Sequence, residues 1–160
     1  MESFMSFVEL YRSSVQTWET DGMGHMNVQF YSEKATNALA ALSLQLGHGR
    51  DEIARTGAHL VAEDHHIRFL REQRPGAPIF IQGGVVEADA NRLTCYFEMV
   101  NTVSGDVAAT FFAHASLRSD TDRSQVPLSD AMIAKAETVK VEVPPHGSPR
   151  GLYLTPPRSA

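Results

Sequence analysis

Apolar residues between positions 28 and 46 recur at steps of three and four, which is the spacing of one face of an α-helix. The recurring positions are Val28, Tyr31, Ala35, Ala38, Leu39, Leu42 and Leu46. Gly47 and Gly49 follow, and glycine favours the end of a helix. Asn27 precedes the segment, and its side-chain oxygen can accept a hydrogen bond from a free amide of the first turn. The pattern predicts one long helix over residues 28–46.

Five other segments are rich in β-branched and aromatic residues, which is typical of strands. The expected strands cover residues 7–18, 58–73, 78–88, 92–101 and 107–119. Turn residues separate the last four strands, which indicates hairpins and an antiparallel meander. Gly83 and Gly84 predict a bend or bulge within the third strand. The fold class is therefore α+β, with an antiparallel sheet of five strands wrapped around one long central helix.

The composition changes after Ser119, where the regular strand pattern ends. Residues 1–118 are predicted to form the domain, and residues 119–160 a C-terminal extension. Ser129 is suited to cap one short helix in this extension. Residues 141–160 are rich in proline and predict an extended tail that either wraps the domain or is mobile.

The composition of the 160 residues, with 42% hydrophobic and 21% charged, suits one globular domain with a core. The net charge of -5 disfavours nucleic acid and anionic membranes as partners, because phosphates bind to basic surfaces. Cys95 is the single cysteine, so no internal disulfide can form, and a cytoplasmic location is expected. No apolar run approaches the ~20 residues of a membrane span, so no membrane segment is expected.

A short polar motif precedes the predicted helix, with the pattern Asp-x-x-Gly-His-x-Asn-x-x-x-Tyr at Asp21, Gly24, His25, Asn27 and Tyr31. This pattern resembles the signature of hot-dog-fold acyl-CoA thioesterases of the 4-hydroxybenzoyl-CoA thioesterase type. The order of one strand, a long helix and four strands is similar to that fold over residues 7–118. The resemblance implies hydrolysis of an acyl-CoA thioester to a free acid and coenzyme A, without a further cofactor.

The chemistry of the motif agrees with the resemblance. A helix start carries unpaired amides and a positive partial charge, so amides near Asn27 and Val28 are candidates to stabilise a thioester oxyanion. Val28 stands where the family often has a second asparagine, so the contact of that side chain is lost. A carboxylate at Asp21 can attack the thioester carbon or activate a water molecule, and the sequence leaves both open.

The other motif residues have more than one possible role. His25 can brace the loop or carry a proton, and Gly24 lets the loop bend so that the acid faces the substrate. Tyr31 belongs to the core or lines the substrate pocket, and Asn27 can cap the helix, contact the substrate, or both.

A polar run, Glu63-Asp64-His65-His66, interrupts the second predicted strand. Strand alternation predicts Glu63 and His65 on one face, and Asp64 and His66 on the other. Glu63 is a second candidate for a catalytic or water-orienting acid, while His65 and His66 are candidates to line the acyl pocket or a subunit interface. A metal site is not predicted, because no third and fourth ligand has a recognisable spacing. The run favours a short or polar acyl group.

Arg68 and Arg71 follow the polar run and are candidates to bind the phosphates of coenzyme A, although a solvated strand end explains them as well. A lone sheet leaves exposed edges, and hot-dog domains resolve this by pairing sheets. The resemblance therefore implies a homodimer or homotetramer. Each site is expected to combine the Asp21 turn of one chain with residues 62–69 of the other. A hot-dog hydratase or dehydratase and a non-catalytic acyl-CoA-binding module are the alternatives.

Overall fold

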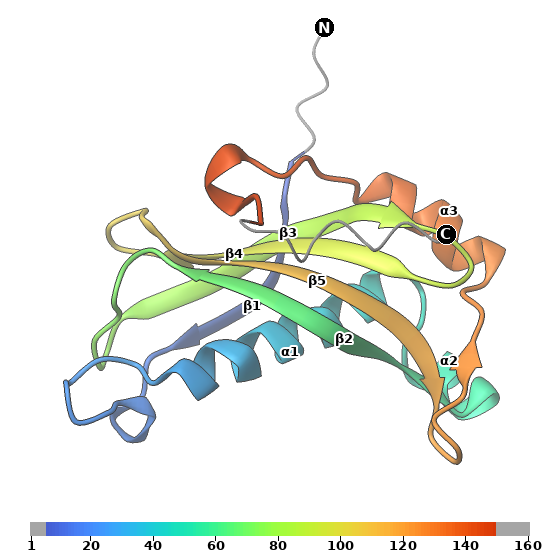
Figure 1. Cartoon of the computed structure of the whole chain (residues 1–160), viewed down its shortest axis with the longest axis horizontal. Helices are drawn as coiled ribbons and strands as arrows, with labels where there is room; N and C mark the ends of the chain where they lie inside the picture. Colours follow the sequence, from blue (N-terminus) through green and yellow to red (C-terminus); the bar gives the residue numbers. More distant parts are fainter. Residues whose placement is uncertain (1–5, 150–160) are drawn as a thin grey trace, which may run out of the picture.

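A long helix lies against one face of a curved antiparallel sheet (Figure 1). The structure is a computed structural model that describes residues 6–149. Its strands are β1 (Val8–Ser14), β2 (Ala58–Phe69), β3 (Pro78–Ala88), β4 (Leu93–Asn101), β5 (Val107–Ser119) and β6 (Gln125–Val126). Its helices are α1 (Val28–Gln45), α2 (Arg50–Thr56) and α3 (Asp130–Thr138), with the 3₁₀ turns η1 (Thr17–Glu19) and η2 (Pro145–Gly147).

The long helix begins where the sequence predicts and ends one residue earlier. The Asn27 side chain accepts a hydrogen bond from the Gln29 amide at 3.1 Å, as a helix cap does. Gly47 has φ +82°, a left-handed conformation that glycine adopts without strain, and the chain leaves the helix there. Helix α2 was not predicted, because none of its residues is buried and it has no apolar stripe for the sequence to reveal.

The strand order in the sheet is β1-β3-β4-β5-β2, and β6 pairs with β5. Strands β3, β4 and β5 form the predicted meander, but β2 pairs with β5 instead of β3. The prediction of a hairpin between β2 and β3 was therefore wrong, since residues 70–77 carry the chain across the sheet. A turn sequence marks where a strand ends and cannot tell a hairpin from a crossover. The sheet also has the short β6 in addition to the five strands predicted.

Two strands end earlier than the sequence predicted. Strand β1 stops at Ser14, because residues 17–19 form the turn η1. Strand β2 stops at Phe69, after which the amides of Leu70 and Arg71 both donate to the carbonyl of Ala108. These early ends leave the following segments free to build the loops at one end of α1.

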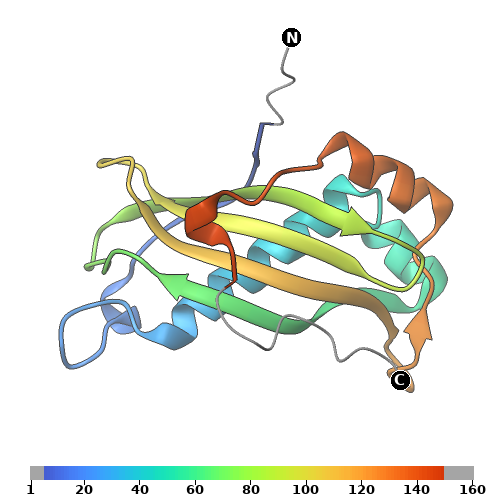
Figure 2. The same ribbon diagram turned by 45° about the horizontal axis from the view of Figure 1, so that its top comes forward.

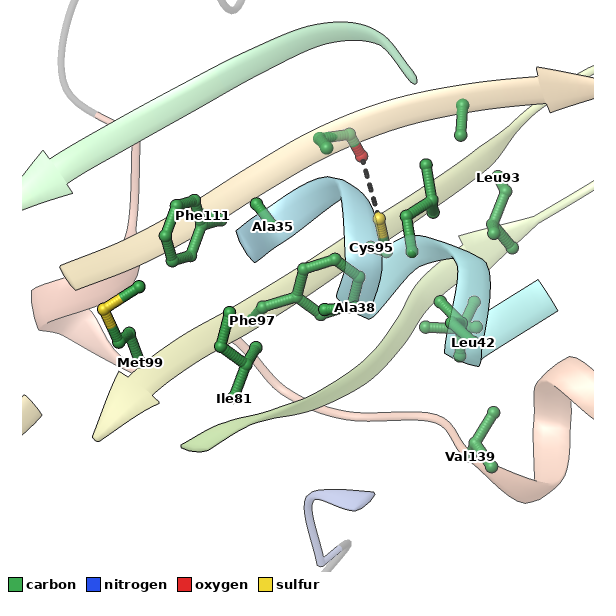
Figure 3. Packing of buried hydrophobic residues seen from close by; sticks show 14 of the residues in the cluster. Ala35, Ala38, Leu42, Ile81, Leu93, Cys95, Phe97, Met99, Phe111 and Val139 are labelled. Atoms are coloured by element: carbon green, nitrogen blue, oxygen red, sulfur yellow. Dashed lines mark hydrogen bonds between the residues drawn. The ribbon is translucent and has the colours of Figure 1, made fainter. Parts of the chain in front are cut away.

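The core lies between α1 and the inner face of the sheet (Figure 3). Ala35, Ala38 and Leu42 of the helix are fully buried against large side chains such as Phe97 and Phe111. The small alanines let the helix approach the sheet closely. Cys95 belongs to this core, and burial raises the pKa of its thiol to about 12, so the group is a packing residue rather than a nucleophile.

The C-terminal segment first pairs with the edge of β3 beyond the end of β1, and its turn η2 then lies on the outer face of the sheet, opposite α1 (Figures 1 and 2). The Val85 amide donates to the Val139 carbonyl at 3.0 Å, and the Val141 amide donates to the Val85 carbonyl at 2.8 Å. Gly84 allows this approach, since a Cβ there would lie 2.2 Å from the Val139 oxygen. The irregularity predicted at Gly83 and Gly84 lies instead between Val85 and Glu87, because these glycines provide space and leave the register unchanged.

A buried ion pair ties the turn η1 to the long helix. Lys34 Nζ lies 2.7 Å from Glu19 Oε2, and the two residues are 3% and 4% exposed. Glu19 Oε1 accepts from the Gln16 amide at 2.7 Å, and the Glu19 carbonyl accepts from the Asn27 amide at 2.7 Å. The ion pair therefore attaches the start of the segment that carries the Asp21 motif to α1, and the Glu19 carbonyl holds its other end at Asn27.

We predict that Gly84→Ala destabilises the fold, because its Cβ would lie 2.2 Å from the Val139 carbonyl oxygen. Backbone must shift to relieve this contact, at a cost of about 1–3 kcal/mol in the free energy of unfolding. Urea denaturation followed by circular dichroism measures the loss. Gly22→Ala is the control, since no atom lies within 4 Å of its Cβ position. Equal denaturation midpoints for both variants would contradict the packing described for Gly84.

We also predict that Lys34→Met lowers the free energy of unfolding by about 3–5 kcal/mol, because the Glu19 carboxylate stays buried without its partner. The double variant with Glu19→Gln is expected to recover part of this loss, since no buried charge remains. Arg55→Met removes the exposed partner of Glu52 and should leave the midpoint nearly unchanged. A Lys34 variant as stable as the Arg55 variant would refute the anchoring role of the pair.

Candidate active site at the start of the long helix

A pocket of about 370 Å³ opens beside the N-terminal end of α1. Two stretches that are distant in the sequence form it: the Asp21 loop with the first turn of α1 that follows it, and the end of β2 with the chain after it. Its lining residues are Asp21, Met23, His25, Met26, Val28, Tyr31, Phe69, Leu70, Arg71 and Glu72. The pocket thus brings together five of the residues proposed from the sequence, namely Asp21, His25, Val28, Tyr31 and Arg71.

The loop before α1 presents the Asp21 carboxylate at the surface of this pocket. The Asp21 amide donates to the His25 carbonyl at 2.9 Å, and the Gly24 amide donates to the Asp21 carbonyl at 3.0 Å. Gly24 has φ +77°, which explains a glycine at this position of the motif. Asp21 Oδ1 accepts from the Met23 amide at 2.9 Å, whereas Oδ2 accepts no hydrogen bond from residues 6–149. The second oxygen is therefore available to a substrate.

The amides of Asn27 and Val28, both proposed as oxyanion donors, differ in whether they already donate a hydrogen bond within the described chain. The Asn27 amide donates to the Glu19 carbonyl, and the Asn27 side chain caps α1, so both of its groups are engaged. Val28 is the first residue of α1 and lines the pocket, and its amide donates no hydrogen bond within the described part of the chain. The Val28 amide, supported by the partial positive charge of the helix start, is the donor best placed for an oxyanion.

His25 is linked to a carboxylate that the sequence did not single out. Its Nε2 lies 3.1 Å from Oε2 of Glu72, which also lines the pocket. Next to this pair, the Met26 amide donates to the carbonyl of Gln73 at 2.8 Å. Gln73 is buried, and its Oε1 accepts from Asn101 Nδ2 at 2.9 Å. Glu72 and Gln73 were missed because the strand pattern placed them at the end of β2.

Tyr31 forms part of the inner wall of the pocket. The residue is 4% exposed, and its ring packs edge to face on Phe69 with centroids 5.1 Å apart. Burial raises the pKa of the Tyr31 phenol, and the nearby charge of Glu72 raises it further. The phenol therefore stays neutral and acts as a wall of the pocket.

The polar run of β2 does not enter this pocket within one chain. A register shift between Ala62 and Asp64 marks a bulge at Glu63, so Glu63 and Asp64 both point to the outer face. The predicted separation of Glu63 from Asp64 on opposite faces was wrong, because the bulge breaks the alternation.

Both carboxylates have partners on β5. Glu63 Oε1 accepts from Ser116 Oγ at 2.5 Å and from an Arg118 nitrogen at 2.6 Å, and these bonds lower the pKa of the Glu63 carboxyl. Asp64 Oδ1 lies 2.9 Å from His114 Nδ1. Glu63 is thus held in an ion pair on the far side of the sheet from α1, away from the Asp21 carboxylate of its own chain.

The other candidates from β2 also lie outside the pocket of their own chain. His65 is opposite the core residue Ala113, and burial lowers the pKa of its imidazole. His66 is opposite Phe112 on the outer face. Arg68 donates to the carbonyl of His146 in η2, which leaves Arg71 as the arginine that faces the pocket.

Two properties of the described residues concern metal ions and membranes. No group of three or more His, Cys, Asp or Glu side chains within residues 6–149 is arranged to hold a metal ion. In the same part of the chain, no helix has the length and apolar character needed to cross a membrane.

Solved structures share this fold at low sequence identity. A hypothetical protein from Staphylococcus aureus in complex with CoA has a TM-score of 0.76 at 14% identity, over 95% of this chain and 99% of its own. A 1,4-dihydroxy-2-naphthoyl-CoA thioesterase from Synechocystis has a TM-score of 0.68 at 18% identity, over 82% and 96%. A DHNA-CoA thioesterase from Staphylococcus aureus has a TM-score of 0.66 at 18% identity, over 77% and 80%.

The family of the chain is assigned by a family model, which is matched by its sequence. No curated protein sequence matches the chain. The family model of the thioesterase-like superfamily matches residues 15–145, a range that includes the Asp21 loop and runs past residue 118 through β6 and α3. The α+β hot-dog fold predicted from the sequence is confirmed, and the chain belongs to the thioesterase-like superfamily.

Proposed function

We propose that the protein is an acyl-CoA thioesterase that hydrolyses an acyl-CoA to a free acid and coenzyme A. The observation that carries this proposal is the pocket in which the Asp21 carboxylate and the start of α1 border one space. Membership of the thioesterase-like superfamily supports it. The named activity of the Synechocystis relative and the CoA in the Staphylococcus aureus relative agree with it.

In the proposed reaction, the thioester carbonyl lies over the start of α1. The Val28 amide and the helix dipole stabilise the oxyanion that develops on the carbonyl oxygen. In one route, Asp21 attacks the carbonyl carbon, the carbon–sulfur bond breaks, CoA leaves as a thiolate, and water then hydrolyses the mixed anhydride. In the other, Asp21 takes a proton from a water molecule that attacks the same carbon, and the carbon–sulfur bond of the tetrahedral intermediate then breaks to release the CoA thiolate. Both routes give the same products.

Other pocket residues have supporting roles in this proposal. Glu72 holds the His25 imidazole and so braces the loop that carries Asp21. Arg71 is the arginine beside the pocket and is suited to bind a phosphate of coenzyme A as it extends toward solvent. No cofactor other than the coenzyme A of the substrate is required.

The proposed assembly is a homodimer, or a homotetramer built from such dimers. Strand β2 lies at one edge of the sheet, and one side of this strand has no neighbouring strand among the described residues. An exposed edge of twelve residues is a template for pairing, which a second copy of the chain would satisfy. Pairing of two β2 strands would bring residues 62–69 of one protomer near the site of its partner. The single buried cysteine agrees with a cytoplasmic location.

The His25–Glu72 pair favours one alternative, a hot-dog hydratase or dehydratase, since that chemistry needs a histidine and an acid to move protons. The thioesterase reaction releases a free thiol, whereas hydration of an enoyl-CoA removes its ultraviolet absorbance and leaves the thioester intact. Assays of both signals on one enzyme preparation separate the two functions. A non-catalytic binding module would give neither signal.

We predict that Asp21→Asn lowers kcat/KM about a hundredfold or more, because the amide keeps the shape and loses the negative charge. Release of coenzyme A, detected with a thiol reagent over a panel of acyl-CoAs, measures the effect. Asp51→Asn, at an exposed site in the first turn of α2, is the matched control. Activity that survives in the Asp21 variant would move the nucleophile or base to another residue.

A second variant tests the bracing of the loop. Glu72→Gln removes the charged partner of His25, and we expect kcat to fall about tenfold as the loop loses its fixed position. Glu72→Asp should retain more of the wild-type kcat than Glu72→Gln, because it keeps the carboxylate. Equal kcat values for wild type and Glu72→Gln would show that the pair does not position the site.

A further inference from the structure

A second and larger cavity lies at the other end of α1, where the proposed reaction does not use it. This groove has a volume of about 670 Å³ and is enclosed by α1, α2 and the start of β2. Its lining combines apolar side chains, among them Leu44, Ile53 and Leu60, with the polar side chains of His48, Arg50 and His59. Leu44 is 65% exposed, although it is a large apolar residue in the middle of this lining. We call this cavity the α1–α2 groove.

The walls of the Asp21 pocket indicate which acyl groups it accepts. Met23, Val28 and Phe69 line it and are among the most exposed large apolar residues of the described chain, which favours an apolar ligand. Asp21 and Glu72 place two carboxylates at the same pocket. Arg71 also lines this pocket and is assigned to a phosphate of coenzyme A, so the two carboxylates are left to repel an acyl group that ends in its own carboxylate.

The two carboxylates of the polar run, which favoured a polar acyl group, lie on the opposite side of the sheet from the pocket. That expectation came from the polar run of β2, but Glu63 and Asp64 point to the outer face of the sheet. Their partners Arg118, Ser116 and His114 lie on the same outer face. Because α1 covers the inner face, these groups are separated by the sheet from the Asp21 pocket of their own chain.

The pocket and the groove lie at opposite ends of the same edge strand. Phe69, the last residue of β2, lines the Asp21 pocket, whereas His59 and Leu60, near its first residue, line the groove. Both cavities border α1: the Asp21 pocket lies at its first turn and the groove lies near its last turns. Figures 1 and 2 show that α1 spans the length between these two places. An antiparallel two-fold pairing of β2 strands places the start of one strand beside the end of the other. The Asp21 pocket of one protomer then faces the groove of its partner.

We propose that the substrate carries an uncharged aliphatic acyl chain that runs from the Asp21 pocket of one protomer into the α1–α2 groove of its partner. This inference rests on the proposed thioesterase function and on the homodimer. It accounts for the exposed Leu44 and Phe69, because the dimer and the acyl chain together would cover both side chains. The groove then serves as the far end of the acyl site, so its depth sets the chain length.

The test compares wild type with Ala40→Trp, which fills the groove from an exposed position on α1. The measured quantity is kcat/KM for CoA esters of two, four, eight, twelve and sixteen carbons, and for succinyl-CoA. We expect wild type to prefer the longer chains and to discriminate against succinyl-CoA. In Ala40→Trp, the ratio of kcat/KM for dodecanoyl-CoA to that for butyryl-CoA should fall at least about tenfold. Gln45→Trp, exposed on α1 and outside both cavities, is the matched control.

Three outcomes of this experiment distinguish failure of the inference from failure of the proposed thioesterase function. Hydrolysis of acyl-CoAs with an unchanged chain-length ratio in both Ala40→Trp and Ala54→Trp would overturn the inference and leave the thioesterase function standing. A wild-type preference for succinyl-CoA would overturn it as well. Absence of hydrolysis of every ester by wild type would overturn the thioesterase function, and the inference with it. Ala54→Trp fills the groove from α2, so a folding defect in one variant does not remove the test.

Discussion

Burial of the apolar stripe of α1 against the curved sheet is the interaction on which the rest of the structure depends. Ala35, Ala38 and Leu42 are fully buried, and the alanines leave room for the large side chains Phe97 and Phe111. This contact fixes the direction of α1 across the sheet. Because the direction is fixed, the first turn of α1 always lies at the end of the sheet where β2 stops, and that is where the pocket forms.

Two sets of polar contacts hold the loop of the candidate site in place. The buried Glu19–Lys34 pair attaches the start of the Asp21 segment to α1, and removal of either partner would leave a charge buried alone. The Met26–Gln73 hydrogen bond and the His25–Glu72 pair attach its other end to the chain after β2. The Asp21 loop is thus held from two sides, although the loop itself is exposed and contains two glycines.

The two faces of the sheet have different roles, and single residues decide which groups lie on each. The bulge at Glu63 directs two carboxylates outward, where Glu63 pairs with Arg118 and Asp64 is hydrogen-bonded to His114. Gly84 and Gly147 let the C-terminal segment lie close to the outer face, and His146 there contacts the buried Glu98 at 2.9 Å. The inner face is left to α1, the apolar core and the pocket.

The sequence by itself determined the features that depend on neighbours along the chain. Helical periodicity and the Asn27 cap predicted α1, and strand composition predicted the bounds of β3 and β5. The motif around Asp21 was also visible in the sequence, since each of these features lies within a few neighbouring residues. Only the tertiary structure decided that β2 pairs with β5, that Glu63 turns outward, that Glu72 lines the candidate pocket, and that Gln73 holds Met26 beside it. These outcomes depend on contacts between residues far apart in the chain, and a local pattern of apolar and polar residues does not record which distant partner each will meet.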